Sequence, residues 1–445
     1  MIKDLQDLIK VPSVSARKQN LIECAKMVMK IMEKTGIKSE LLYLIDENGN
    51  KLDVPPIVYG EILSKKNPDA KTLLFYNHYD VQPEDPVGLW KYPPFDGVIE
   101  NNYIFGRGAS DDKGELITRI NAVESFLKED GDIPCNVKFI VEGEEEIGSR
   151  HIEQYLSKFQ KKFRCDGIIW EFGYIDENDR PIISLGMKGL LYVELIAHGP
   201  SRDVHSSLAV LIENPAWKLI KLLDTLQDKN GKILIKNWYD DINALSEEEL
   251  NTISNEYFNE ESFKKEYGIT QFIDNKTGIN IKKALVGNPS CNIAGLISGY
   301  TGDGAKTIIP STAMAKIDFR LVPNMNPQKQ FQLLKNHLVE NGYSNDIELK
   351  MIHGEAAART SLNDPFVKKV EDSAKEIYDN KIVKTISSPG TGPMHAFNKI
   401  LNVPSVSIGS THVFSKIHSP NEYARIDLLI KTTKCIKKIM EKMAI

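Results

Sequence analysis

The chain has 445 residues, 41% hydrophobic and 26% charged, a composition typical of a globular protein with two or three domain cores. Its 56 basic and 61 acidic residues give a formal net charge of −5, without the basic excess that binding to nucleic acid or an anionic membrane requires. No apolar run approaches the ~18 residues needed to cross a bilayer, and the N-terminus has no apolar signal core. We therefore expect a soluble, cytoplasmic protein.

The five cysteines are far apart in the sequence and form no CxxC pair. A thiolate zinc site needs ligands clustered at short spacing, and an odd number of cysteines does not favour a disulfide framework. We expect neither, and we interpret the cysteines as small buried apolar residues.

The first 190 residues alternate between helix-like and strand-like stretches. Apolar stripes at helical spacing predict helices and short apolar runs predict strands, in the order helix 20–35, strand 72–76, helix 113–128, strand 137–141 and strand 167–170. This alternation predicts an α/β fold with a mostly parallel sheet and helices on both faces.

The pattern changes near Met187 and changes back after Pro365. Between these points we expect strands at 190–197, 313–321 and 348–352, a helix at 215–226 and a polar surface segment at 228–285. After them we expect helix 365–378, strands 382–386 and 404–408, and helix 424–443. The simplest architecture is one α/β domain interrupted by an α+β insertion.

Each of the three strands predicted in the first half ends in charged or metal-capable residues. His78 and Asp80 follow the first strand, the acidic run Glu142–Glu146 follows the second, and Glu171 follows the third. Sites in parallel sheets gather at the carboxyl ends of strands. The sequence therefore predicts a functional site at this edge of the sheet.

Two further segments offer candidate ligands. The glycine-rich loop Gly106–Gly114 carries Asp111 and Asp112 before a helix, but it matches no phosphate-binding pattern, and His418 lies in a polar turn. Taken singly, such features are more often a solvated helix start, a helix cap or a structural histidine. Together they form a His/carboxylate set without cysteine, which suits zinc, manganese or cobalt.

These motifs resemble the M20 metallopeptidase family, which includes glutamate carboxypeptidases, aminoacylases, succinyl-diaminopimelate desuccinylases and carnosine dipeptidases. The resemblance runs through five separated segments, from Val11–Ser15 to His418. It implies a zinc-peptidase catalytic domain with a mixed, mostly parallel sheet, formed by residues 1–187 and 359–445. It also implies an inserted α+β lid and dimerisation domain at residues 188–358.

The resemblance also implies which residues act. One metal takes His78, Asp111 and Glu171, and the other takes Asp111, Glu146 and His418, with Asp111 bridging the two ions. Asp80 orients His78, and Glu145 is the general base. His205 polarises the scissile carbonyl of the substrate bound in the partner subunit. The implied substrate-binding residues are Arg320, Thr307, Gly390 and Thr391. A non-proline cis peptide between Asp111 and Asp112 is also implied.

By the same resemblance, the expected activity is two-metal amide hydrolysis of the dipeptidase or carboxypeptidase type, with zinc, or else manganese or cobalt, in a homodimer. The segment Arg320–Met325 resembles the dipeptidase branch. Glu171 stands where aminopeptidase and carnosine-type members usually have Asp, and it favours a carboxypeptidase or deacylase. His205 is followed by Ser-Ser where many members have Ser-Gly. The alternatives are an N-acyl-amino-acid deacylase of the aminoacylase, acetylornithine deacetylase or desuccinylase type, and an inactive metal-binding scaffold.

Overall fold

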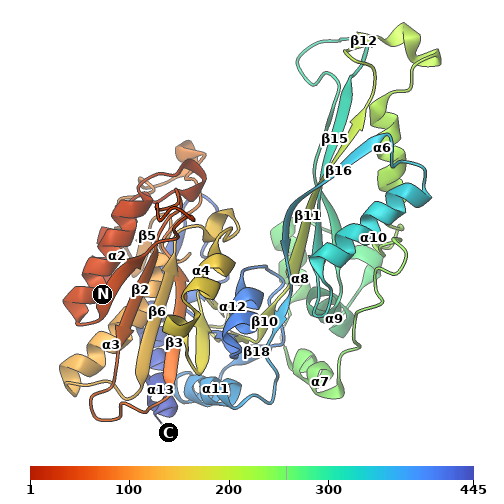
Figure 1. Cartoon of the computed structure of the whole chain (residues 1–445). Coiled ribbons are helices and arrows are strands. Elements are labelled where there is room, and N and C mark those ends of the chain that lie inside the picture. Colours follow the sequence, from red (N-terminus) through yellow and green to blue (C-terminus); the bar gives the residue numbers. More distant parts are fainter. Residues whose placement is uncertain (257, 445) are drawn as a thin grey trace. The chain divides into compact units, whose positions relative to one another are not determined.

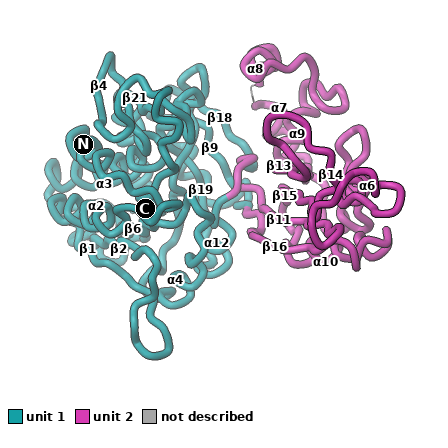
Figure 2. Tube along the Cα trace, turned by 90° about the horizontal axis from the view of Figure 1, so that it is seen from above, with its two compact units in different colours: residues 1–186, 359–387, 392–445 teal, residues 187–358, 388–391 magenta. Residues whose placement is uncertain are grey.

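The computed structural model describes residues 1–256 and 258–444, and the chain divides into two compact units (Figure 2). Unit 1 comprises Met1–Gly186, Arg359–Ser387 and the chain from Gly392 onward, and unit 2 comprises Met187–Ala358 and Ser388–Thr391. The short segment 388–391 belongs with unit 2 because the backbone N–H of Lys188 donates to the carbonyls of Ser388 and Gly390, at 3.3 and 2.9 Å.

Unit 1 is built on an eight-stranded sheet whose strand order is β1-β2-β6-β3-β7-β19-β9-β18 (Figure 1). The strands are β1 (Lys38–Leu42), β2 (Ile57–Ile62), β3 (Thr72–His78), β6 (Asn136–Glu142), β7 (Gly167–Trp170), β9 (Ile182–Ser184), β18 (Val383–Thr385) and β19 (Ser405–Ser407). The central pairs β6/β3, β3/β7 and β7/β19 are parallel, as is β9/β18, whereas β1/β2, β2/β6 and β19/β9 are antiparallel. The predicted mixed, mostly parallel sheet is confirmed.

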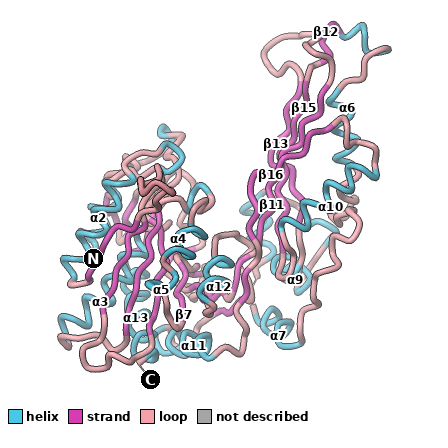
Figure 3. Tube along the Cα trace, viewed as in Figure 1, coloured by secondary structure: helices cyan, strands magenta, loops and turns pink. Residues whose placement is uncertain are grey.

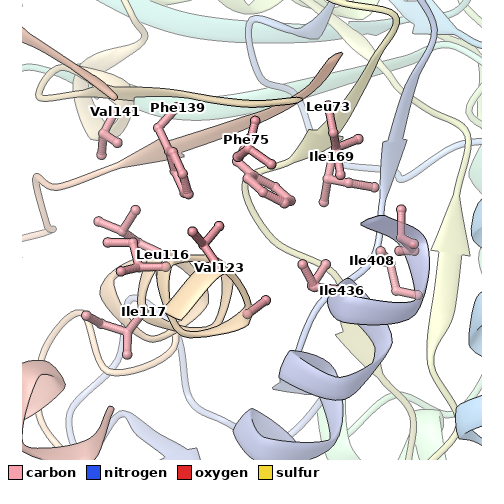
Figure 4. Packing of buried hydrophobic residues seen from close by; sticks show 14 of the residues in the cluster. Leu73, Phe75, Leu116, Ile117, Val123, Phe139, Val141, Ile169, Ile408 and Ile436 are labelled. Carbon is pink, nitrogen blue, oxygen red and sulfur yellow. The ribbon is translucent and has the colours of Figure 1, made fainter. Parts of the chain in front are cut away.

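Helices cover both faces of this sheet. Figure 4 shows Phe75 and Phe139 directed towards Leu116 and Val123, in the core that also contains Ile436. On the opposite face, the ring of Tyr76 lies 4.2 Å from Trp170 and 4.6 Å from Phe397. Burial on both faces explains why β3 reads as a continuous apolar run rather than as an alternating one.

The helices of unit 1 form two groups. The first group is α1 (Ile2–Ile9), α2 (Leu21–Thr35), α3 (Lys113–Glu129), α11 (Pro365–Ile377) and α13 (Ile426–Met443), and the second is α4 (Ile152–Lys158), α5 (Gln160–Phe163) and α12 (Met394–Leu401). Three of the five cysteines, Cys24, Cys135 and Cys435, are fully buried in this unit, and all five are free thiols.

Two small sheets support the loops of unit 1. The strands β4 (Val98–Glu100), β5 (Tyr103–Phe105) and β21 (Tyr423–Arg425) form a three-stranded sheet, and β8 (Tyr174–Ile175) pairs with β20 (Thr411–His412). The antiparallel pairing of β21 with β5 joins segments that lie about 320 residues apart, and the loops that follow β5 and precede β21 are therefore neighbours.

Unit 2 is an antiparallel sheet with the order β13-β15-β11-β16, which Figure 3 shows as long strands beside α6 and α10. Its elements are β11 (Gly189–His198), β13 (Ser290–Ser298), β15 (Thr312–Leu321), β16 (Ile347–Glu355), α6 (Pro215–Asp224) and α10 (Pro327–Glu340). The side chains of β11 and β15 alternate, so that one face packs on the two helices and forms a second core around Val193, Ile317 and Leu334.

The polar segment 228–285 contains three helices, α7 (Glu247–Asn255), α8 (Glu260–Tyr267) and α9 (Ile279–Gly287). At the other end of unit 2, the short strands β12 (Val204–His205) and β14 (Ile308–Ile309) form a ribbon. Within the described residues, no helix has the length and apolar character that crossing a membrane requires.

Candidate metal centre

Six side chains from five segments of unit 1 gather into two adjacent groups. One group is His78, Glu145 and Glu171, and the other is Asp111, Glu146 and His418; within each group, one potential ligand atom per residue lies within 4.8 Å of the others. Asp111 joins the groups, because its Oδ1 lies 3.1 Å from Nε2 of His78 and its Oδ2 lies 3.1 Å from Nε2 of His418. The same His418 nitrogen lies 3.1 Å from Oε2 of Glu146.

The sheet accounts for most of this convergence. His78 is the last residue of β3, and Glu171 follows β7 directly. Glu145 and Glu146 begin a 3₁₀ turn, η3 (Glu145–Ile147), just after β6. Since β6, β3 and β7 are parallel neighbours, their carboxyl ends bring these side chains to the same edge.

Asp80 connects the first of these strand ends to the next. Its carboxylate accepts the backbone N–H groups of Glu145, at 3.3 Å, and Glu146, at 3.0 Å. Nδ1 of His78 lies 3.0 Å from the main-chain oxygen of Asp80 and 3.4 Å from its Oδ1. Asp80 therefore contacts the ring of His78 and also fixes the backbone of the acidic turn.

Asp112 fixes the backbone of His78. Its Oδ2 accepts the backbone N–H of His78 at 2.9 Å and the side-chain amide of Asn77 at 2.7 Å, and all three residues are buried. The peptide bond between Asp111 and Asp112 is cis, which confirms the expectation stated above.

The electrostatics of the two groups favour a bound cation. Burial raises the pKa of Glu145 and of Glu171 well above the usual range, and the negative charge of neighbouring carboxylates raises both further. For Asp111, burial acts in the same direction, but contacts with His418 and His78 outweigh it and lower the pKa. Four carboxylates crowded around two imidazoles need additional positive charge to be ionised together.

Two buried carboxylate oxygens of the cluster have no partner that compensates their negative charge. Oε1 of Glu146 and Oε2 of Glu171 are inaccessible to solvent and have no hydrogen-bond partner in the structure. An unpaired buried carboxylate oxygen is costly, and coordination to a cation removes the cost. Carboxylate oxygens and imidazole nitrogens without a thiolate are a donor set that zinc, manganese or cobalt accepts. The residues present therefore fit a metal centre.

His205 and Thr307, predicted to act on the substrate, lie together in unit 2. His205 ends β12 and is exposed, and its Nδ1 lies 2.9 Å from Oγ of Ser207. The backbone N–H of Ser206 donates to the carbonyl of Thr307 at 3.1 Å. The β12–β14 ribbon thus brings these two segments side by side.

Arg320 and Thr391, also predicted to bind substrate, form a second group in unit 2. Nη1 of Arg320 donates to Oγ1 of Thr391 at 2.7 Å, and Gly390 is the adjacent residue. Nε of Arg320 lies 3.7 Å from Oδ1 of Asp318. The guanidinium has five N–H donors, so further donors remain for a carboxylate.

Three buried acidic residues support the surrounding loops, namely Asp112, which the sequence offered only as a candidate ligand, and Glu115 and Glu422, for which it predicted no role. Glu115 accepts the backbone N–H groups of Ser410 and Thr411 and pairs with Arg119 at 2.6 Å. Asp112 stood in the recognised loop, and Glu422 stood in the His418 turn. Only their burial distinguishes them from solvated acids, and burial is a property of the folded chain.

A mixed α/β fold that gathers carboxylates and imidazoles at the ends of three neighbouring strands is that of a metal-dependent hydrolase. The family model described as Peptidase family M20/M25/M40 matches residues 74–442. The chain belongs to this family of metal-dependent peptidases, and it is an enzyme of the hydrolase class.

The relatives include dipeptidases and a carboxypeptidase. The Cys-Gly metallodipeptidase dug1 of Schizosaccharomyces pombe is 31% identical over 347 residues, which are 76% of this chain and 72% of the relative. The human Beta-Ala-His dipeptidase is 29% identical over 411 residues, which are 89% and 79% of the two chains. An M20 family metallo-carboxypeptidase from Sulfolobus solfataricus superposes with a TM-score of 0.91 at 40% identity, covering 99% of this chain and 98% of that one.

Proposed function

We propose that the protein hydrolyses the amide bond of small peptides that carry a free C-terminal carboxylate, as a dipeptidase or carboxypeptidase. The observation that carries this proposal is the meeting of two imidazoles and four carboxylates in one cluster, namely His78, Asp111, Glu145, Glu146, Glu171 and His418. The activities named for the relatives point the same way. The cytoplasmic location stays a prediction.

The cluster would hold two divalent ions, with zinc proposed and manganese or cobalt as the other candidates. His78, Asp111 and Glu171 would hold one ion, and Asp111, Glu146 and His418 the other. The support is the position of Asp111, whose two oxygens each lie 3.1 Å from a different histidine. Each proposed ligand set also contains one buried carboxylate oxygen without a hydrogen-bond partner, Oε2 of Glu171 in the first set and Oε1 of Glu146 in the second.

Glu145 is the proposed general base, since it lies with His78 and Glu171 but is not needed to complete either ligand set. When bound, the ions supply Lewis acidity, which makes a water acidic and polarises the amide carbonyl. Glu145 takes the proton from the attacking water and gives it to the leaving amine. His205 donates a hydrogen bond to the oxygen on which negative charge develops.

Arg320, with Thr391 and Gly390, is the proposed receptor for the C-terminal carboxylate. The contact of Arg320 with Thr391 orients the guanidinium, and a planar guanidinium binds a carboxylate through two parallel hydrogen bonds. Such a contact selects substrates that end in a carboxylate.

The geometry of unit 2 supports a homodimer. Arg320 and Thr312 lie near opposite ends of β15, about 26 Å apart at the ~3.3 Å rise of a strand, and the ribbon with His205 extends beyond the Thr312 end (Figure 1). In a dipeptide, the carboxylate and the scissile carbonyl are only about 4 Å apart. Arg320 and His205 of one subunit therefore do not serve the same substrate, and His205 would act on the substrate of a partner.

Exposed apolar side chains of unit 2 are consistent with such an interface. Val210 and Leu211, five and six residues after His205 in the sequence, are 88% and 81% exposed, and Trp217 on α6 is 61% exposed. Large exposed apolar side chains are typical of a surface that another chain covers. The proposed dimerisation domain is therefore unit 2.

The second candidate is an N-acyl-amino-acid deacylase, which Glu171 favours as much as it favours a carboxypeptidase. The family resemblance associates glutamate at this position with substrates whose amino group is acylated or peptide-bonded. The same cluster would perform the same amide hydrolysis on such a substrate, and Arg320 would still bind its carboxylate.

Substrate profiling decides between the candidates. The metal-depleted protein is loaded with zinc, manganese or cobalt and assayed on a dipeptide library, on C-terminally amidated dipeptides and on N-acetyl amino acids. We expect turnover of dipeptides and little turnover of the amidated set. Preferential turnover of N-acetyl amino acids would establish the deacylase, and no turnover with any metal would indicate an inactive scaffold.

A further inference from the structure

Glu422 is a fully buried carboxylate beneath the loop that carries Asp111. Its Oε1 accepts the backbone N–H groups of Ser110, at 3.0 Å, and Asp111, at 3.1 Å. Its Oε2 accepts the backbone N–H of Gly108, at 3.1 Å, and Nη1 of Arg107, at 2.8 Å. Four donors from one loop thus converge on the two oxygens of one side chain.

Glu422 also belongs to the turn that carries His418, four residues earlier. The backbone N–H of Gly106 donates to the carbonyl of Glu422 at 3.0 Å, and Oγ of Ser110 donates to the carbonyl of Tyr423 at 2.8 Å. Glu422 therefore connects the loop of Asp111 to the turn of His418, two residues whose side chains lie 3.1 Å apart in the same group.

Arg107 explains how this carboxylate is kept in the interior. The Arg107 and Glu422 side chains are each 1% exposed, and the guanidinium also donates to the carbonyl of Pro83 at 3.1 Å and lies over the ring of Trp90. A buried carboxylate is tolerated when a cation and hydrogen bonds satisfy it.

We propose that Glu422 is a positioning residue that sets the separation of Asp111 and His418 and so prepares the site for its metal ions. The inference rests on the proposed function, in which both residues are ligands. It assigns to Glu422 an effect on metal affinity in addition to its contribution to stability. Hydrogen-bonded partners of ligating side chains commonly contribute 10–100-fold to metal affinity.

The structure predicts that glutamine does not replace Glu422. Each oxygen of the carboxylate accepts two hydrogen bonds, so a side-chain NH₂ in either position would face two donors. The loop would have to move on one side, either at Gly108 and Arg107 or at Ser110 and Asp111.

The test compares Glu422→Gln with Asp132→Asn. Asp132 is a matched control because it is also buried and its carboxylate also accepts backbone N–H groups, from Lys65, Lys66 and Ile133. It precedes β6, at the end of the sheet opposite to the metal centre. Arg107→Lys is a milder change. It keeps the positive charge next to Glu422 but removes the planar guanidinium, whose two NH₂ groups donate to Glu422 and to the carbonyl of Pro83.

Zinc alone is titrated calorimetrically into each metal-free protein, and the visible absorption of the cobalt-loaded forms reports the geometry around the ion. We expect Glu422→Gln to weaken the binding of at least one ion 10–100-fold and to change the cobalt spectrum. Asp132→Asn should lower thermal stability but bind zinc as the wild type does. Should Glu422→Gln fail to fold, Arg107→Lys is expected to change affinity and spectrum in the same direction.

The two possible failures are distinguishable. If the wild-type protein binds no zinc, the proposed function fails. If the wild type binds two ions, and a folded Glu422→Gln protein, or Arg107→Lys in its place, shows wild-type affinity and spectrum, the positioning role is overturned and Glu422 serves stability alone.

Discussion

Within five residues, four glutamates of the acidic run have four different environments. Glu142 accepts hydrogen bonds from Tyr76 and Ser149, and burial raises its pKa to about 8. Glu144 lies 2.7 Å from Nδ1 of His151, whereas Glu145 and Glu146 point to different groups of the metal centre. Four residues of the same type, close together in the sequence, therefore have different contacts in the structure.

The first prediction separates two neighbours in this run. Glu145→Gln removes the proposed proton acceptor but keeps the size and polarity of the side chain, so we expect wild-type zinc content and a fall in kcat of at least ~10²-fold. Glu144→Gln is the matched control, because Glu144 contacts His151 rather than either group, and it should change kcat little. Metal analysis and steady-state kinetics check both. Lost zinc in Glu145→Gln would make Glu145 a ligand instead of the base.

The second prediction concerns protons released by metal binding. Contacts with Asp111 and Glu146 raise the pKa of His418, so the imidazole is protonated at neutral pH in the metal-free protein. A metal ligand must be neutral imidazole, and binding therefore expels this proton. Because a proton is released on binding, zinc affinity should rise with pH across the neutral range and fall as the pH is lowered. Calorimetry in two buffers of different ionisation enthalpy measures the release, and a buffer-independent enthalpy would contradict it.

At the scale of elements, the loop 106–112 is enclosed between α1, α3 and the turn that precedes β21. Lys113, the first residue of α3, is buried and donates to the carbonyls of Leu8, in the last turn of α1, and Val11, just past its C-terminal end. Gly114 follows, and a Cβ there would lie 2.1 Å from the carbonyl oxygen of Ala109. The loop that carries Asp111 has no room to move towards the helix.

The third prediction tests this close approach. Gly114→Ala should push the backbone at Ala109 away and lower the free energy of unfolding by about 1–3 kcal/mol. It should also weaken zinc binding, because the proposed ligand Asp111 lies two residues after Ala109. Gly88→Ala is the control, since nothing lies within 4 Å of its Cβ position. It should change stability by less than about 0.5 kcal/mol. Denaturant unfolding and zinc titration report both effects, and equal behaviour of the two variants would show that the loop adapts.

The sequence predicted those elements whose apolar pattern is strong. The strand at 167–170 has the observed bounds, α2 and α3 differ from their predicted ranges by one residue at one end, and β6 differs by one residue at each end. The helices of segment 228–285 were not predicted because the segment is polar: α8 buries no side chain, α7 buries only Ile253, and α9 buries Ile281 and Val286. Helix α10 was overlooked although Asn326 and Pro327 mark its start.

Much of the candidate site was visible in the sequence for a related reason. His78, Glu146 and Glu171 follow predicted parallel strands, so topology alone brings them to one edge. The positions of Asp111 and His418 depend on the β5–β21 pairing, which joins distant segments, and only the family resemblance indicated them. The role of Glu422 depends on burial and on four converging donors, which no spacing rule contains.

At the scale of the whole molecule, the fourth prediction tests whether two subunits share a site. Inactive His205→Ala and inactive Glu145→Gln proteins are mixed and allowed to exchange subunits. A heterodimer then has one site with both residues intact and one site with neither. With random pairing, half of the dimers are mixed, so recovered activity should approach about a quarter of the wild-type value.

A second mixture serves as the control. Glu145→Gln combined with His418→Ala changes two residues of the same cluster, so no pairing yields an intact site and no activity should return. Exchange is verified by native mass spectrometry. Absence of recovery in the first mixture after verified exchange would place His205 in its own subunit's site or outside the reaction.

The spacing of the proposed ligands along the chain has a consequence for biosynthesis. His78 and His418 are 340 residues apart, and most of unit 2 is translated between them. At 5–20 residues per second, the ribosome adds His418 about 20–70 s after His78. Once Glu171 has been added, the nascent chain carries the three strand-end ligands but still lacks β19, α13 and the Glu422 turn that complete the cluster. A metal ion that takes His418 as a ligand can therefore bind only after residue 418 has been added, late in synthesis.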